Sequence, residues 1–147
     1  MTMPWHEELL REVVGTQYFA VLNTLGHGLP YSNLVSFAAT DDLRSLVFVT
    51  GRNTRKYGNI QDNHNISLLI DNRTNKPSDT SQAIAITVIS TAREEIDNKS
   101  FFQAIFLARH PQLRHFVEAP DSAIMLVTVR EYIVAAFDKT ETVHISQ

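Results

Sequence analysis

Short apolar runs with β character follow one another closely in the first third of this chain, and they constrain its fold more than any other feature. Residues 18–24, 31–39 and 46–50 are each rich in aromatic, branched and other apolar side chains. The first gap contains Gly26, His27 and Gly28, and the second contains two consecutive aspartates, so both gaps are predicted turns. Strands this closely spaced are typical of an antiparallel meander.

The rest of the chain adds further β segments and several helices. Helices are predicted where apolar side chains recur at helical spacing or where a cap residue or proline precedes them. The polar segment 71–81 is predicted to be a loop, and the charged segment 93–97 a solvated strand end. The remaining predicted strands are 66–70, 82–96, 123–129, 132–137 and a short terminal one at 142–145. The predicted helices are 4–14, 54–62, 98–109 and 111–118.

These elements predict a single domain over residues 1–147, mainly β with peripheral helices. The expected architecture is a six- to seven-stranded, mostly antiparallel barrel. The length of 147 residues, with 44% hydrophobic and 20% charged residues, suits one globular domain. No repeat, linker or low-complexity segment interrupts the pattern.

Composition excludes several classes of function. The chain has no cysteine, which excludes disulfides, thiolate nucleophiles and cysteine metal sites. A net charge of -3 and a pI of about 6.0 argue against a nucleic-acid partner. No apolar run approaches the roughly 20 residues of a membrane span, and the acidic N-terminus is unlike a secretory signal. We therefore expect a cytoplasmic protein without a membrane partner.

Positive charge is concentrated in one segment of this acidic chain. Arg52, Arg55 and Lys56 lie within five positions, between a strand predicted to end at Thr50 and a helix predicted to begin at Thr54. A helix N-terminus offers free backbone N–H groups and a partial positive charge, to which threonine hydroxyls and cations add further donors. The segment therefore predicts a phosphate site, and the alternative is a solvated turn with an ordinary N-cap at Asn53 or Thr54.

The wider pattern resembles the flavin-phosphate segment of the pyridoxamine 5′-phosphate oxidase-like, FMN-binding split-barrel family. The resemblance covers roughly residues 17–137, including a polar loop followed by Gln82 and a long strand. The LARHP run at 107–111 also resembles the latter half of the family. The positions that carry the phosphate motif are Phe48, Thr50, Thr54, Arg55, Lys56, Ile60 and Asn63, followed by the strand 66–70.

The resemblance implies an FMN-binding split barrel that forms a homodimer with flavin at its interface. Thr50, Thr54, Arg55 and Lys56 would hold the FMN phosphate, and residues 32–35 would line the isoalloxazine, partly through main-chain groups. Gln82 would reach the flavin from the other subunit. The full set of expected cofactor-binding residues is Ser32, Asn33, Leu34, Val35, Val49, Thr50, Thr54, Arg55, Lys56 and Gln82.

The expected function is that of an FMN-dependent oxidoreductase acting on a small molecule over the exposed flavin face. No catalytic acid or base is identified. The sequence leaves open a flavin- or haem-binding protein without turnover, and a reductase that uses the deazaflavin F420. Pyridoxamine phosphate is not the expected substrate, because the helix 98–109 lacks a second phosphate clamp. The six histidines show neither HxH nor HExxH spacing, so no metal site is predicted.

Overall fold

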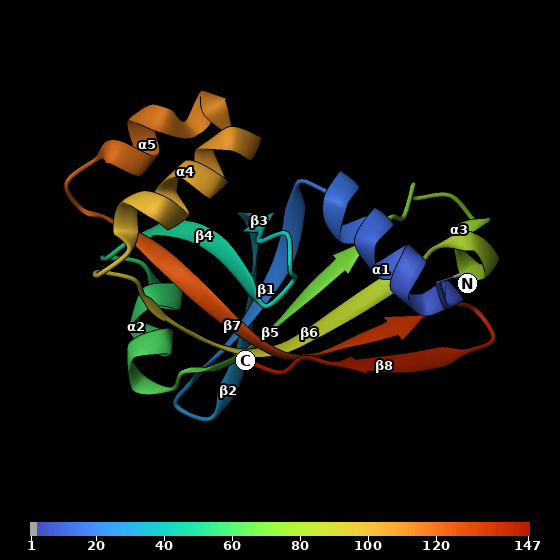
Figure 1. The fold of residues 1–147 in the computed structure, drawn as a ribbon. Coiled ribbons are helices and arrows are strands. Elements are labelled where there is room, and N and C mark those ends of the chain that lie inside the picture. Colours follow the sequence, from blue (N-terminus) through green and yellow to red (C-terminus); the bar gives the residue numbers. More distant parts are fainter. Residues whose placement is uncertain (1–2) are drawn as a thin grey trace.

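The computed structural model describes residues 3–147 and contains one curled antiparallel sheet with helices around it (Figure 1). The strand order is β2-β1-β5-β6-β7-β4-β3, and β8 pairs with β7. The predicted mainly β split barrel is thus confirmed, with eight strands in place of six or seven. The strands are β1 (Phe19–Gly26), β2 (Leu29–Ser36), β3 (Ala38–Ala39), β4 (Ser45–Gly51), β5 (Asn65–Asp71), β6 (Ala85–Glu94), β7 (Ser122–Ala135) and β8 (Thr140–His144). The helices are α1 (Trp5–Thr16), α2 (Arg55–Asp62), α3 (Asp79–Gln82), α4 (Lys99–Arg109), the 3₁₀ turn η1 (Pro111–Leu113) and α5 (Arg114–Glu118).

A change of partner at Phe37 shapes the barrel. The strand predicted at 31–39 divides there: β2 pairs with β1, whereas β3 pairs with β4. Phe37 itself is fully buried, so the core fixes the point at which the chain turns from one partner to the other. This step connects the two ends of the sheet through the chain, but β2 and β4 do not pair with each other, and the gap between them is the split.

Strand β7 corrects the prediction of two separate strands at 123–129 and 132–137. In the pairing with β6, Ile89 lies opposite Glu131 and Ser90 lies opposite Val129, so Arg130 is an extra residue on β7. This is a β-bulge, which inserts one residue without ending the strand. The polar pair at 130–131 resembles a turn in the sequence, but the bulge accommodates it and β7 continues without interruption.

The core has two parts, one on each side of the strands β4 and β7. Helix α1 covers the larger part, which lies inside the curled sheet, and contributes Leu10, Val13 and Val14 to it. The smaller part lies under α4 and α5, where Val47 and Val49 of β4 contact apolar side chains of these helices. None of the helices in residues 3–147 is long and apolar enough to cross a membrane.

The segment predicted as a polar loop at 71–81 contains the short helix α3, and β6 begins only at Ala85. One carboxylate explains this: Asp79 accepts hydrogen bonds from the backbone N–H groups of Thr74, Asn75 and Lys76. Because these bonds close the loop on itself, the chain makes a helical turn before it enters the sheet. Gln82 therefore ends a helix instead of opening the strand, which corrects the sequence-based expectation.

Candidate anion and cofactor site

Helix α2 begins directly after β4, and its first turn forms the candidate anion site. Thr54 is the N-cap, as predicted, and its Oγ1 accepts a hydrogen bond from the backbone N–H of Tyr57 at 3.3 Å. The hydroxyls of Thr50 and Thr54 are 2.8 Å apart. The backbone N–H groups of Arg55 and Lys56 have no acceptor among the residues that the structure describes. Two backbone donors are thus free at the positive end of the helix dipole.

Thr50 has a supporting position in this site. It is only 1% exposed, and its Oγ1 lies within hydrogen-bond distance of both Thr54 Oγ1 and the carbonyl of Gly51. The burial places its hydroxyl behind that of Thr54 instead of at the surface. Thr50 therefore orients the capping hydroxyl, and Thr54 is the better placed of the two to meet a ligand.

The positive charge of Arg52 is already paired within the protein. Its Nη2 and Nε donate to the two carboxylate oxygens of Glu94 at 2.6 and 3.2 Å, and its Nη1 donates to the carbonyl of Pro120 at 3.0 Å. The sequence-based interpretation of 93–97 as a solvated strand end is confirmed for Arg93 and Asp97, which are exposed. It is wrong for the two glutamates, because the side chain of Glu94 is only 16% exposed and Glu95 is 3% exposed. The cluster of three cations is reduced to two.

The Arg52–Glu94 pair also includes a tyrosine of α2. The hydroxyl of Tyr57 donates to Glu94 Oε1 at 2.7 Å. Hydrogen bonds from Arg52 lower the pKa of Glu94 against the opposing effect of burial, and Tyr57 lowers it further. The same bonds raise the pKa values of Arg52 and Tyr57, because both groups donate to the carboxylate. All three side chains keep their ordinary charge states at neutral pH.

Arg55 and Lys56 carry the remaining positive charge. Neither forms an ion pair with any carboxylate in residues 3–147. The guanidinium of Arg55 lies 4.3 Å from the ring centre of Tyr31, which connects α2 with β2 across the split. Lys56 is partly buried, and this burial lowers its pKa. A bound anion would offset that desolvation of the ammonium group.

Strand β2 presents its two faces differently. Asn33 and Val35 share the inner face with Tyr31, and the Oδ1 of Asn33 is buried without a hydrogen-bond partner. Ser32 and Leu34 face the other way: Ser32 Oγ donates to an asparagine of β1 at 2.6 Å, and Leu34 is 65% exposed. β2 is the edge strand of the sheet, so one side of its backbone has no neighbouring strand. Ser32 and Leu34 can therefore contact a ligand on the inner side only through their main-chain atoms.

Two further expected residues lie away from the first turn of α2. The side chain of Val49 packs under α4 and α5, so only its main chain faces the region of Thr50. Gln82 lies at the far end of the β5–β6 pair, since α2 adjoins Asn65 and α3 adjoins Ala85 (Figure 1). A single chain therefore does not bring Gln82 to the anion site. Its contact with a flavin remains a prediction for a partner subunit.

The donor set fits a phosphate monoester. It comprises two free backbone N–H groups, the Thr54 hydroxyl region and two cations without acidic partners in residues 3–147. The unpartnered amide oxygen of Asn33 is an acceptor and does not belong to this set. Charge-assisted donors of this kind match a dianionic phosphate.

Sequence reasoning missed Tyr31 and Glu94. The only signal for Glu94 was an acidic residue near the end of an apolar strand, which does not reveal a partner 42 positions away.

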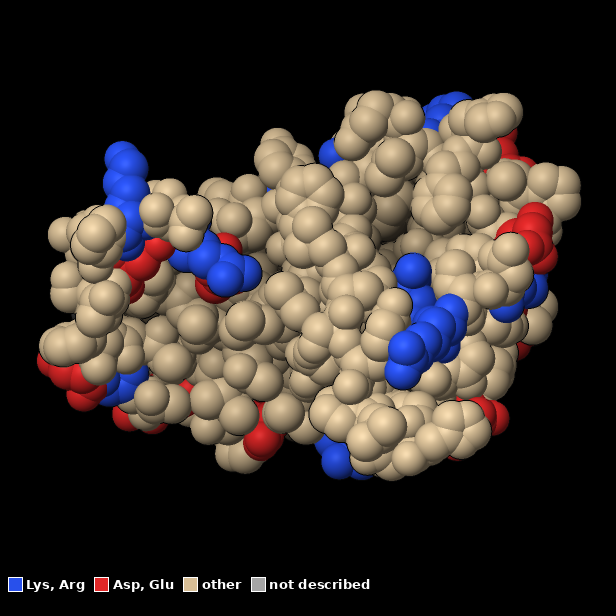
Figure 2. Space-filling model, turned by 180° about the vertical axis from the view of Figure 1, so that it is seen from behind, with Lys and Arg blue, Asp and Glu red and all other residues tan. Residues whose placement is uncertain are grey.

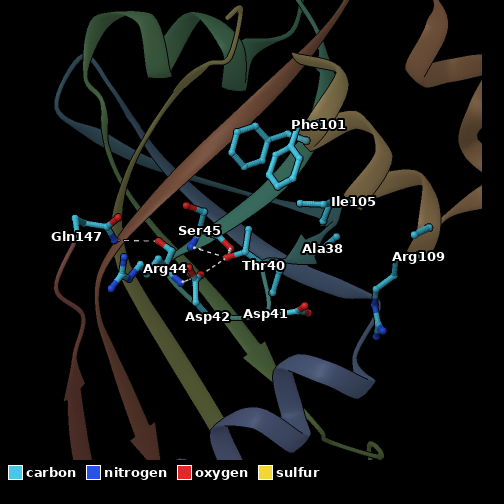
Figure 3. Close-up of a pocket in the computed structure, with 13 residues that line it drawn as sticks. Ala38, Thr40, Asp41, Asp42, Arg44, Ser45, Phe101, Ile105, Arg109 and Gln147 are labelled. Atoms are coloured by element: carbon cyan, nitrogen blue, oxygen red, sulfur yellow. Dashed lines mark hydrogen bonds between the residues drawn. The ribbon is translucent and has the colours of Figure 1, made fainter. Parts of the chain in front are cut away.

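A separate cavity of about 830 Å³ lies between α4 and the β3–β4 turn (Figure 3). Phe101 and Ile105 of α4 form its apolar wall. On the opposite wall the Thr40 hydroxyl donates to Asp42 at 2.7 Å, so these polar groups already satisfy each other. The cavity adjoins the Ser45 end of β4 instead of the Thr50 end, and none of the expected cofactor-binding residues lines it.

Comparison with known proteins agrees with this fold. Residues 6–134 match the family model described as pyridoxamine 5′-phosphate oxidase, and the chain belongs to this family. No curated protein matches the sequence.

Solved structures similar to this chain include a heme-binding protein, a general stress protein and a FAD-binding protein. A heme-binding protein from Mycobacterium smegmatis has a TM-score of 0.86 at 14% identity, covering 98% of this chain, which spans 60% of that protein's length. General Stress Protein 26 from Bacillus anthracis has a TM-score of 0.75 at 20% identity, with 95% of this chain and 98% of that one covered. A FAD-binding protein from Mesorhizobium loti has a TM-score of 0.71 at 14% identity, with 94% of each chain covered. At these identities the likeness concerns the fold.

Proposed function

We propose that this protein binds FMN, with the phosphate at the first turn of α2, and acts as an oxidoreductase on a small molecule beside the flavin. The observation that carries the proposal is the pair of unused backbone donors at Arg55 and Lys56, together with their two side-chain cations. An uncompensated concentration of donors and positive charge matches the one strongly anionic group of FMN.

The residues of the site divide into three roles. Thr54, Arg55 and Lys56 hold the phosphate, and Thr50 orients Thr54. Asn33 and the main chain of 32–35 contact the polar edge of the isoalloxazine, where the unpartnered oxygen of Asn33 accepts a hydrogen bond. When bound, the flavin supplies the electron or hydride transfer, and the protein supplies binding, orientation and electrostatics.

A homodimer forms part of the proposal. On the outer face of the sheet, Val21 lies between Leu34 of β2 and Leu69 of β5, and the row continues through Thr87 to Ile133. Most of the side of the molecule seen in Figure 2 is uncharged, with Lys and Arg in a few separate groups. An apolar sheet face of this kind suits an isologous contact. Light scattering should give twice the monomer mass, and a monomer at micromolar concentration would contradict this part.

The deciding experiment compares FMN with riboflavin, which lacks the phosphate. We expect the purified protein to retain FMN absorption bands after desalting, and to bind FMN at least about tenfold more tightly than riboflavin because charge-assisted phosphate bonds are lost. Equal affinities for the two flavins would refute the phosphate assignment. Turnover is then tested by reduction of the bound flavin with NADH or NADPH, followed by a screen of small-molecule acceptors.

Haem binding is the second candidate, supported by the similarity in fold to the mycobacterial heme-binding protein. A haem iron needs an axial ligand, and the buried His110 is already engaged, with Nε2 2.7 Å from the carbonyl of Phe37. Exposed histidines such as His64 remain available. A Soret band on titration with haemin, without flavin bands after exposure to FMN, would favour this function. The same titration with F420 tests the deazaflavin alternative.

A further inference from the structure

We propose that Glu94 is a positioning residue for the phosphate site, acting through Tyr57 and Arg52. The inference rests on the proposed function and adds a determinant that lies outside the phosphate motif. Glu94 is the last residue of β6, and its carboxylate forms no hydrogen bond or ion pair with Arg55 or Lys56. Any effect of Glu94 on the phosphate therefore passes through other side chains.

The first connection runs through Tyr57, the third residue of α2. Its hydroxyl donates to Glu94 at 2.7 Å, and its backbone N–H donates to the capping oxygen of Thr54 at 3.3 Å. Thr54 Oγ1 in turn lies 2.8 Å from Thr50 Oγ1. Tyr57 thus links the Glu94 carboxylate with both threonines, because its hydroxyl bonds to the carboxylate and its backbone N–H to Thr54. These contacts fix the first turn of α2 and therefore the direction in which its free N–H groups point.

The second connection runs through Arg52, which lies in the turn between β4 and α2. The Nε and Nη2 atoms on one edge of its guanidinium donate to Glu94, while the backbone N–H of Arg52 donates to the carbonyl of Asp121 at 2.9 Å. The turn is therefore fixed to β6 on one side and to the segment before β7 on the other. Because the two charges neutralise each other, the net charge beside the first turn comes from Arg55 and Lys56 alone.

These contacts predict that Glu94 sets the selectivity for a phosphorylated flavin, not the affinity for the ring. Without the carboxylate, Tyr57 loses its acceptor and Arg52 loses its partner, so both the helix start and the preceding turn relax. The isoalloxazine contacts on β2 do not involve these groups. Phosphate recognition should therefore weaken more than ring recognition.

The test measures dissociation constants for FMN and riboflavin in Glu94→Ala, Glu94→Gln and Tyr57→Phe, with thermal unfolding as a check on folding. We expect Glu94→Ala to weaken FMN binding by about tenfold or more and riboflavin binding by less than about threefold. Glu94→Gln retains an acceptor for Tyr57 and should recover part of the FMN affinity, and Tyr57→Phe should show an intermediate loss. The matched control is Glu131→Ala, which removes another strand carboxylate paired at 3.3 Å with His144, and should leave the ratio unchanged.

The outcomes separate the two proposals. A wild-type protein that binds FMN no better than riboflavin refutes the proposed function itself. A wild-type protein that prefers FMN, with unchanged preference in folded Glu94→Ala and Tyr57→Phe, refutes the positioning role alone. Equal losses for both flavins would assign Glu94 a purely structural role and also overturn the inference. If Glu94→Ala does not fold, Glu94→Gln and Tyr57→Phe decide the question.

Discussion

Two polar segments flank the β5–β6 strand pair, and they use similar residues differently. Residues 50–57 adjoin one end and residues 72–82 the other, and each combines threonine, basic residues and the start of a short helix. In the second segment Asp79 accepts three backbone N–H groups, and Arg73 pairs at 2.9 Å with the adjoining Asp71 at the end of β5. In the first, the nearby carboxylate of Glu94 binds Arg52 and leaves the donors of Arg55 and Lys56 unused.

The comparison shows that a high density of cations and hydroxyls does not by itself make an anion site. The position of one carboxylate decides the outcome. An acid inside the turn closes it into a structural unit, whereas an acid that is occupied by a neighbouring arginine leaves the turn open to a ligand. The predictions below test this difference between the two segments.

The largest expected effect is on flavin affinity. Arg55→Ala and Lys56→Ala should each weaken FMN binding by about 1.5–3 kcal/mol, roughly 10- to 150-fold in Kd, because each removes a charge-assisted bond to phosphate. The matched substitutions Arg73→Ala and Lys76→Ala in the other segment should leave Kd almost unchanged. Isothermal titration calorimetry measures all four, and similar losses in both segments would remove the distinction.

Gly26→Ala tests how α2 is anchored to β1. A Cβ atom at this position would overlap Asn59 Oδ1, while Asn59 Nδ2 donates to Thr24 Oγ1 at 3.0 Å. We expect a loss of about 1–3 kcal/mol in the free energy of unfolding because the buried contact is overpacked. Gly15→Ala is the control, since no atom outside the neighbouring residues and the backbone of α1 lies within 4 Å of the added Cβ. Urea denaturation compares the two, and equal stability would contradict the anchoring.

Lys56 predicts a pH dependence of FMN binding. Because burial lowers the pKa of the free lysine, its charge is lost at a lower pH than in an ordinary lysine, and FMN affinity should fall as pH rises through that lowered pKa. Phosphate stays dianionic above about pH 7, so it does not contribute to the decline. Lys56→Arg keeps its charge and should flatten the profile measured between about pH 7 and 10. Parallel profiles for wild type and variant would show that Lys56 is not the titrating group.

The smallest expected effect on the whole protein comes from Asp79→Asn. The amide side chain weakens the bonds to the backbone N–H groups of Thr74, Asn75 and Lys76, so the amide hydrogens of this loop should exchange faster. Exchange in β5 and β6 should not change. Unchanged exchange at these three amides would show that Asp79 does not hold the loop closed.

Local patterns in the sequence predicted most of the fold. The alternation and apolar runs of β1, β4 and β5 and the helical spacing of α1 and α4 are local signals, and so is the cap at Thr54. The bulge at Arg130 and the change of partner at Phe37 escaped prediction, because both are settled by which strand lies alongside. Gln82 was predicted to open the strand because an apolar run follows it. The sequence does not reveal that Asp79 binds three backbone N–H groups and turns the preceding loop into a short helix.

In the candidate site, too, the sequence predicted local features and missed contacts between distant residues. Thr54, Arg55 and Lys56 are adjacent in sequence and lie together at the first turn of α2, and their contact with a phosphate stays a prediction. Arg52 was grouped with them because its partner Glu94 lies on another strand. The separation of Ser32 and Leu34 from Asn33 and Val35 follows from strand alternation, which a run of four consecutive residues conceals.

The central position of β7 has a consequence for how the chain acquires its structure during synthesis. This strand lies between β6 and β4, and among residues 3–147 only β8 follows it. Until residues 120–135 have left the ribosome, β4 has only the two-residue β3 as a strand partner, and the turn before α2 lacks the contacts of Arg52 with Pro120 and Asp121. The turn that forms the candidate phosphate site must therefore reach its final order late, only after β7 has been translated.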